Sequence, residues 1–187
     1  MSEWIETSAG NRISKLAEIS GPDRIIISGN ATIHPGVKIH GDVELLANAS
    51  NKNPDTATTI QLGKFCYIRS NSQIIPPVLK ESKPENKTWH GPISIGAYTI
   101  IGNNSIVKSA NIGNRVLIED DCVLENLSIV YDCCLIRRGT VIPPKTVIPP
   151  YSEVSGVAGK DFSVRSLNNS YKKLIELEAK ELQILGI

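Results

Sequence analysis

Three histidines are the residues most open to a chemical role in this sequence, and two of them lie close together. His34 and His40 stand in the stretch IHPGVKIHGD, residues 33–42, where Asp42 follows the second histidine after one glycine. Histidine and carboxylate side chains are common zinc ligands, so this stretch raises the possibility of a metal centre. A catalytic zinc ion needs about three protein ligands and an open position. The remaining histidine, His90, lies in a different part of the chain.

The four cysteines are the other candidate ligands or redox groups. None of them forms the paired C-x-x-C spacing of a zinc ribbon. The N-terminal stretch MSEWIETSAGNR is polar and has no apolar signal sequence, so we expect a cytosolic chain in which disulfides do not form. These four cysteines are Cys66, Cys122, Cys133 and Cys134.

Charge and composition exclude several classes of partner. With 20 Lys and Arg residues against 19 Asp and Glu residues, the 187-residue chain has a net charge of +1 and no basic stripe, so nucleic acid is not an expected partner. No run approaches the roughly 18 apolar residues of a membrane span, and direct membrane insertion is not expected. Isoleucine and valine are abundant whereas Phe, Trp and Met are scarce, which indicates one domain with a β-branched core.

A six-residue repeat supplies the elements that must position these residues. From residue 95 the chain reads IGAYTI, IGNNSI, VKSAN, IGNRVL, IEDDCV, LENLSI, VYDCCL, IRRGTV, IPPKTV, IPPYSE and V, with a single unit of five residues. Every unit begins with an aliphatic residue, and a small or short residue stands two positions before each of the later ones. This pattern is the mark of a hexapeptide β-helix, in which three short strands make one triangular coil. Residues 18 apart then stack in neighbouring coils, roughly 4.8 Å apart.

The same register extends toward the N-terminus and is interrupted twice. We predict an all-β fold, a parallel β-helix over residues 25–157, preceded by a segment, 1–24, that caps the prism. One insertion, 47–59, is polar and turn-rich and is expected to be a mobile loop. The other, 76–92, carries Trp89 and His90. Long excursions from a rigid scaffold often carry binding sites, so this insertion either contacts a partner or packs back on the prism.

The register of the repeat also predicts whether each cysteine points into or out of the prism. Cys66, Cys122 and Cys134 occupy the small inward position, where a compact apolar thiol is well suited. Cys133 is predicted to point outward.

A helix follows the repeat over residues 163–186. Ser163 and Ser166 are both candidates for its N-cap. Apolar residues recur at helical spacing, and the expected position of the helix is along one face of the prism. The predicted inward face consists of Leu167, Tyr171, Leu174, Ile175, Leu182 and Leu185.

Two enzyme classes are built on hexapeptide prisms, and the histidines bear on both. Gamma-class carbonic anhydrases bind zinc through three histidines, two of them spaced H-x4-H, and no such spacing occurs here. Six residues rotate the chain by one face, so His34 and His40 lie on adjacent faces and cannot converge on one ion within a monomer. Acyltransferases of this fold use a histidine general base, and His90 is the only candidate for that role here. A general base must be oriented by a second group, and the sequence near His90 does not indicate one. We therefore expect no catalytic, cofactor-binding or metal-binding residues and no enzyme activity; the alternative is an acyltransferase or a gamma-carbonic-anhydrase-like enzyme.

Charged residues 18 apart predict a ladder on the outer surface. Glu119 and Asp120 stack against Arg137 and Arg138 one coil later. Each pair of this charge ladder is worth about 0.2–1 kcal/mol. The ladder is either a solvated face tied by ion pairs or a charged docking patch for a partner.

The chain resembles the dynactin subunit 5 family over nearly its full length. The resemblance rests on WIETSAGNRIS (4–14), IHGD (39–42), IRSNSQIIPP (68–77), the shortened unit VKSAN (107–111) and IPPKTVIPPYSEVSG (142–156). The chain departs from that family in the longer 47–59 insertion and in His40, where arginine is usual.

This resemblance implies a left-handed parallel β-helix and a role without catalysis. The family belongs to the pointed-end complex of dynactin, in the cytoplasm on the microtubule cytoskeleton. Its partners there are dynactin subunit 6, an actin-related pointed-end protein and a larger pointed-end subunit. The complex engages dynein cargo adaptors and supports transport of cargo such as early endosomes. The site residues that this role makes candidates for partner binding are the charge ladder, Trp89 and His90.

Overall fold

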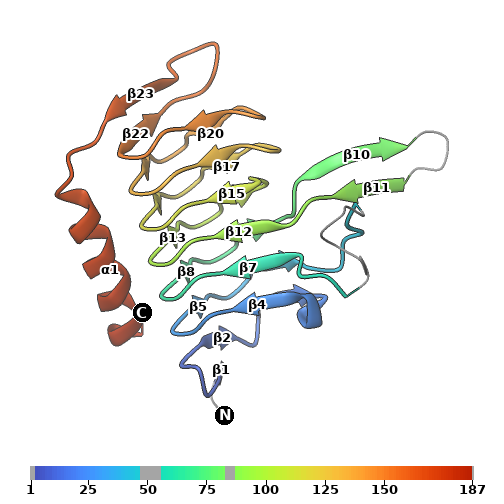
Figure 1. Cartoon of the computed structure of the whole chain (residues 1–187). Helices are drawn as coiled ribbons and strands as arrows, with labels where there is room; N and C mark the ends of the chain where they lie inside the picture. The colour runs from blue at the N-terminus through green and yellow to red at the C-terminus, as the bar shows by residue number, and fades with distance from the viewer. Residues whose placement is uncertain (1–2, 47–55, 83–86, 187) are drawn as a thin grey trace.

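The computed structural model describes residues 3–46, 56–82 and 87–186, and its body is a three-sided left-handed β-helix (Figure 1). Parallel strands climb each side, and every third short strand returns to the same sheet. The largest sheet has nine strands, ordered β1 (Trp4–Glu6), β2 (Arg12–Ser14), β5 (Thr32–Ile33), β8 (Tyr67–Ile68), β13 (Ile100–Ile101), β16 (Leu117–Ile118), β19 (Leu135–Ile136), β22 (Ser152–Ser155) and β23 (Ser163–Ser166).

The other two sides are six-stranded sheets. The second sheet contains β3 (Glu18–Ser20), β6 (Lys38–His40), β9 (Gln73–Ile74), β14 (Ile106–Val107), β17 (Val123–Leu124) and β20 (Val141–Ile142). The third sheet contains β4 (Ile25–Ile27), β7 (Ile60–Leu62), β12 (Ile93–Ile95), β15 (Asn111–Ile112), β18 (Ile129–Val130) and β21 (Val147–Ile148). A short 3-10 helix, η1 (Pro22–Arg24), precedes β4.

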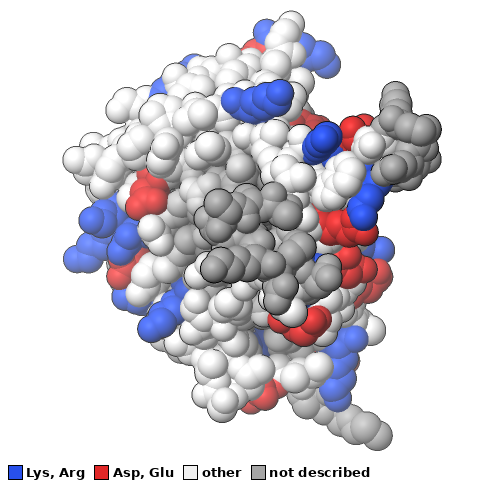
Figure 2. All heavy atoms as spheres, turned by 45° about the vertical axis from the view of Figure 1, so that its right-hand side comes forward, with Lys and Arg blue, Asp and Glu red and all other residues white. Residues whose placement is uncertain are grey.

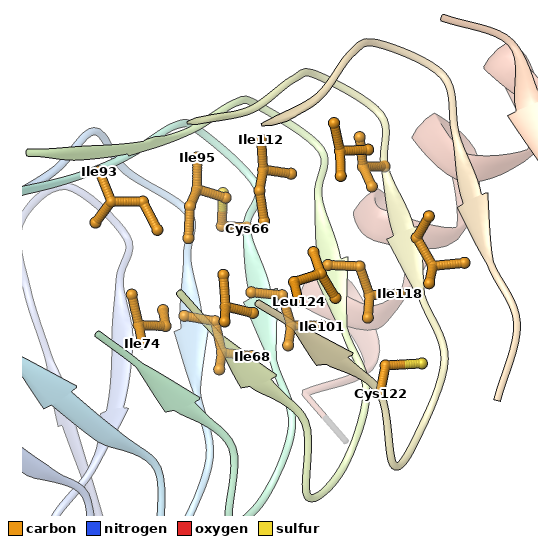
Figure 3. Packing of buried hydrophobic residues seen from close by; sticks show 14 of the residues in the cluster. Cys66, Ile68, Ile74, Ile93, Ile95, Ile101, Ile112, Ile118, Cys122 and Leu124 are labelled. Atoms are coloured by element: carbon orange, nitrogen blue, oxygen red, sulfur yellow. The ribbon is translucent and has the colours of Figure 1, made fainter. Parts of the chain in front are cut away.

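The aliphatic residue that begins each hexapeptide fills the prism, as the period predicts. Ile101, Ile118 and Ile136 are paired across successive coils, and each is 0% exposed. Figure 3 shows such side chains gathered inside the coil, with Cys66 and Cys122 among them. Strands of all three sheets contribute β-branched and leucine side chains to this core.

Most corners are turned by a residue in the left-handed conformation. All eleven described non-glycine residues with positive φ stand three positions before an aliphatic core residue: Asn30, Phe65, Asn71, Tyr98, Asn104, Arg115, Asp121, Leu127, Cys133, Lys145 and Tyr151. The five-residue unit lacks such a corner, and there the Ser109 and Ser128 hydroxyls hydrogen-bond at 2.8 Å. Glycine is required where coils approach closely: a Cβ at Gly102 would lie 2.4 Å from the carbonyl carbon of Glu119.

Burial suits the cysteines to packing. Cys66, Cys122 and Cys134 lie in the prism core, where burial raises their thiol pKa values to about 12, 11 and 11. Cys133 lies outside that core cluster, which agrees with its predicted outward position, but it is only 2% exposed and does not reach the surface. Tyr151, one coil later at the same corner, lies near the thiol, and Cys133 raises the pKa of its hydroxyl.

The N-terminal boundary differs from the predicted one. β2 and β3 already lie parallel to β5 and β6, so the coils begin at Arg12 and not at residue 25. Ile13 and Ile19, six residues apart, pack against the core and are the signal that sequence reasoning missed. Among β1 to β4, it is β1 that departs from the coil, by pairing antiparallel with β2.

Proline and an antiparallel strand close the C-terminal end of the prism. In the lower coils the N–H groups of Glu125 and Tyr131 donate to carbonyls of the next coil. One coil later those positions are Pro143 and Pro149. Proline has no backbone N–H, so no donor is left unpaired at these two positions. β23 pairs antiparallel with β22 and covers the edge of the first sheet.

The C-terminal helix α1 (Tyr171–Leu185) is shorter than the predicted 163–186, because residues 163–166 are used as β23. The helix lies along the first sheet (Figure 1) and packs Ile175 and Ala179 against the prism, where Ala179 meets Tyr67 and Ile100. The predicted inward face is right for Leu167 and Ile175 but wrong for Leu174 and Leu185, which are 55% and 63% exposed.

Polar contacts set the rotation of α1. The Arg115 guanidinium meets the Glu176 carboxylate at 3.0 Å, and the Thr32 hydroxyl donates to Gln183 Oε1 at 2.6 Å. Gln183 Nε2 also donates to the Gly10 carbonyl at 3.0 Å. The helix therefore connects the coil that contains Arg115 to the N-terminal coil.

Candidate functional site

The charge ladder forms as its spacing predicts. β16 and β19 pair with Ile118 opposite Ile136, which places Glu119 beside Arg137 and Asp120 beside Arg138. Arg137 Nη1 lies 3.2 Å from Glu119 Oε1, and Arg138 Nη2 lies 2.9 Å from Asp120 Oδ2. The backbone N–H of Arg138 also donates to Glu119 Oε2 at 2.8 Å.

A third carboxylate, which sequence reasoning missed, extends the ladder by one coil. Arg137 Nε donates to Glu153 Oε1 at 2.6 Å. This hydrogen bond is the largest of the effects that raise the pKa of Arg137. Glu153 lies opposite Leu135 in the next coil, 18 residues on, so the repeat carried the signal. The guanidinium is therefore held between two carboxylates.

Asp120 is also part of the coil's own corner. Its Oδ1 accepts hydrogen bonds from the backbone N–H and the side-chain amide of Asn103, at 2.7 and 3.1 Å. The same device recurs at another corner, where Asn114 N–H donates to Asp132 Oδ1 at 2.8 Å. Asp120 thus has a structural role at this corner, whereas Arg138 is paired with Asp120 but has 70% of its side chain exposed.

The ladder forms one wall of a groove between the first sheet and α1. The groove has a volume of about 310 Å³, and its accessible lining is mainly polar and charged. Its lining consists of Arg69, Ile100, Gly102, Leu117, Ile118, Glu119, Asp120, Arg138 and Glu178. A partner segment in this groove would meet both signs of charge.

The second insertion is a hairpin, β10 (Val78–Ser82) and β11 (Lys87–His90), that projects from the prism (Figure 1). Asn126 holds its root: Asn126 Oδ1 accepts from Val78 N–H at 2.7 Å and Nδ2 donates to the Val78 carbonyl at 2.9 Å. Acidic and basic side chains lie close together beside the hairpin (Figure 2), where Lys87 pairs with Glu44 at 2.9 Å.

Trp89 and His90 occupy different environments on this hairpin. The ammonium groups of Lys80 and Lys87 each lie 5.7 Å from the Trp89 ring centroid. His90 forms a β-bridge with Leu45, and burial lowers the pKa of its imidazole. Most of the other insertion, residues 47–55, lies outside the described residues, so the prediction of a mobile loop there is not addressed.

The two histidines of the opening stretch are separated, as the six-residue spacing predicts. His34 follows β5 of the first sheet, whereas His40 ends β6 of the second. His34 Nε2 lies 2.6 Å from the Tyr67 hydroxyl, and the Trp4 ring packs edge-on against His34. Asp42 Oδ1 accepts from the Ser20 hydroxyl at 2.7 Å, which is a turn contact.

Within residues 3–46, 56–82 and 87–186, no three His, Cys, Asp or Glu side chains gather closely enough to hold an ion. No helix among the described residues is long and apolar enough to cross a membrane.

Solved structures similar to this chain share its fold. A hexapeptide transferase family protein from Anaplasma phagocytophilum superposes with a TM-score of 0.62 at 17% identity, covering 94% of this chain and 90% of that one. A perosamine N-acetyltransferase from Caulobacter crescentus gives a TM-score of 0.56 at 13% identity over 83% of this chain and 56% of the other. At these identities the likeness concerns the fold alone.

Sequence comparison is more specific. A protein named Dynactin subunit 5 from Dictyostelium discoideum is 30% identical over 113 residues, which is 60% of this chain and 48% of that protein. The matched region thus spans about half the length of this curated relative. The family model described as Dynactin subunit 5 matches residues 1–181. The chain belongs to the Dynactin subunit 5 family.

Proposed function

We propose that this chain is a non-catalytic structural subunit of the dynactin pointed-end complex. The match of the family model to residues 1–181 is the observation that carries the proposal. In this role the chain binds dynactin subunit 6, the actin-related pointed-end protein and the larger pointed-end subunit. The assembly supports attachment of dynein to cargo adaptors in the cytoplasm, on the microtubule cytoskeleton.

The charge ladder and the hairpin are the proposed partner contacts. Arg138 offers an exposed guanidinium beside this groove, which suits a carboxylate-bearing segment of a partner. Trp89 between two lysines offers a large planar side chain of the kind that anchors interfaces.

The acyltransferase alternative requires His90 as a general base. A general base must be oriented by a second group. Among the described residues His90 Nδ1 is buried without a hydrogen-bond partner, and the residue's backbone is committed to the bridge with Leu45. This environment disfavours the enzyme and supports the structural role.

The test is co-purification of the pointed-end subunits with the tagged chain from its own cells. The Arg137→Ala/Arg138→Ala variant should lose at least one of these subunits or the cargo adaptor. Lys108→Ala, which removes an exposed 3.7 Å ion pair with Glu125 on another sheet, is the matched control and should retain them. If the double variant keeps both pointed-end assembly and adaptor binding, the ladder is only a solvated ion-pair face.

A further inference from the structure

The outer face of α1 carries an apolar stripe that nothing in the described chain covers. Its members are Leu174, Leu177, Ile184 and Leu185, with exposed fractions of 55%, 45%, 81% and 63%. The opposite face is fixed against the prism by Ile175 and Ala179, so the helix cannot turn this stripe inward without losing its own anchor. We call these four residues the outer stripe.

The spacing of the outer stripe is that of a docking face. Positions 174, 177, 184 and 185 fall within about one third of the helix circumference at 100° per residue. Single exposed aliphatic residues are ordinary on a protein surface, but several on one face of a helix mark an interaction site; here Glu181 lies between the pairs Leu174/Leu177 and Ile184/Leu185. Helices with such a row commonly bind another amphipathic helix.

Lys173 and Lys180 border the outer stripe on the side of Leu177 and Ile184, and Lys172 lies further round the helix. Lys172, Lys173 and Lys180, the lysine edge, line a hollow of about 420 Å³ together with Asn169, Glu176 and Leu177. Glu176 is the only carboxylate in that lining, and it is already paired with Arg115 at 3.0 Å and Lys180 at 2.8 Å.

The position of two of these lysines strengthens the charge argument. Lys172 and Lys173 lie in the first turn of α1, which contains no acidic residue. The amino end of a helix carries a partial positive charge, so cations there are unfavourably placed and an anionic partner is favoured.

We propose that the outer stripe and the lysine edge together form a docking surface for an amphipathic helix of a partner protein that is acidic along one edge. The partner's apolar row would lie on the outer stripe, and its carboxylates would face Lys173 and Lys180. This surface lies on α1 and does not depend on the dynactin role, so either proposal stands if the other fails.

The observations favour this occupant over two others. In an antiparallel pairing of two copies the same edges meet, so the lysine edge of one helix would face that of the other. An anionic membrane surface is disfavoured because two glutamates would face it. Glu181 lies within the stripe, and Glu178 lies on the border opposite the lysines.

The probe is a labelled synthetic amphipathic peptide with leucines along one face and glutamates along the other, measured against the full chain by fluorescence anisotropy at low and moderate salt. A peptide with lysines in place of the glutamates is its control. We expect the glutamate peptide to bind at least tenfold more tightly than the lysine peptide, with affinity that falls as salt rises.

Two variants separate the apolar from the charged contribution. Leu177→Gln should weaken binding of the glutamate peptide at least tenfold. Val147→Gln is its control, because Val147 is a 53% exposed aliphatic residue on β21 of the third sheet, and it should leave binding unchanged. Lys172→Glu/Lys173→Glu should reverse the preference toward the lysine peptide. Circular dichroism of each variant verifies that the helix is retained.

Three results would overturn the proposal. One is equal or absent binding of the two peptides. Another is concentration-dependent self-association, seen by analytical ultracentrifugation, that Leu177→Gln abolishes, since a second copy would then be the occupant. The last is flotation of the chain with phosphatidylserine vesicles that Leu177→Gln abolishes, which would assign the stripe to a membrane.

Discussion

Replacing Ile118 by alanine tests whether the aliphatic column is the core that holds the coils together. Ile118 is 0% exposed and is paired with Ile101 below and Ile136 above, each also 0% exposed. The change removes three carbon atoms, which at about 0.8 kcal/mol for each buried group is about 2.4 kcal/mol of lost transfer free energy. The neighbouring coils are held by their own hydrogen bonds and cannot close the cavity fully, which adds a further cost.

The expected loss in the free energy of unfolding is therefore about 3–4 kcal/mol, within the range of about 2–5 kcal/mol for buried Ile-to-Ala changes. For a chain of this size it corresponds to a fall in Tm of roughly 10 °C. Urea unfolding followed in parallel by circular dichroism and tryptophan fluorescence measures it, and coincident curves establish that the transition is two-state.

Val147→Ala is the matched control, because Val147 is on a strand of the same kind but 53% exposed. It should cost less than about 1 kcal/mol. If Ile118→Ala costs no more than this control, the column does not carry the stability of the prism, and the account of the core is refuted.

Three further predictions concern other parts of the molecule. Arg138→Ala should lower the free energy of unfolding by less than about 1 kcal/mol in urea titrations, because its ion pair is exposed; a larger loss would make the charge ladder a stability element. Burial lowers the pKa of His90, so the unfolded chain binds more protons at acidic pH; the stabilising effect of the neutral imidazole is complete above the ordinary pKa of 6.5 and is lost as pH falls through the folded value. The pH dependence of Tm should flatten in His90→Gln, and an unchanged slope would contradict this assignment. Burial raises the pKa of Cys66 to about 12, so iodoacetamide should label it at neutral pH only after unfolding, and mass spectrometry that detects rapid labelling of the native chain would refute the packing.

The repeat predicted the parts of the molecule that depend on local period. The inward position of Ile118 and the pairing of Glu119 with Arg137 follow from a period of six and a stack of 18, since a parallel coil repeats the same contacts at each level. Glu153 obeys the same rule, because it stands opposite Leu135, 18 residues earlier.

Tertiary demands decided the parts that the pattern did not predict. Ser163 and Ser166 are both reasonable helix caps, but the open edge of β22 needed a partner and took residues 163–166 as β23. Leu174 faces outward because the Arg115–Glu176 and Thr32–Gln183 contacts set the rotation of α1, and those partners are distant in the chain. Cys133 is covered by Tyr151 from the next coil, which adjacent residues do not reveal.

The central claim, membership of a pointed-end assembly, is tested most directly by the mass and composition of the complex that contains this chain. The measurement is native mass spectrometry of the tagged chain purified from its own cells, followed by identification of its subunits. We expect one large complex that contains a second hexapeptide subunit and an actin-related protein. A homotrimer of this chain alone, carrying zinc or coenzyme A, would contradict the account.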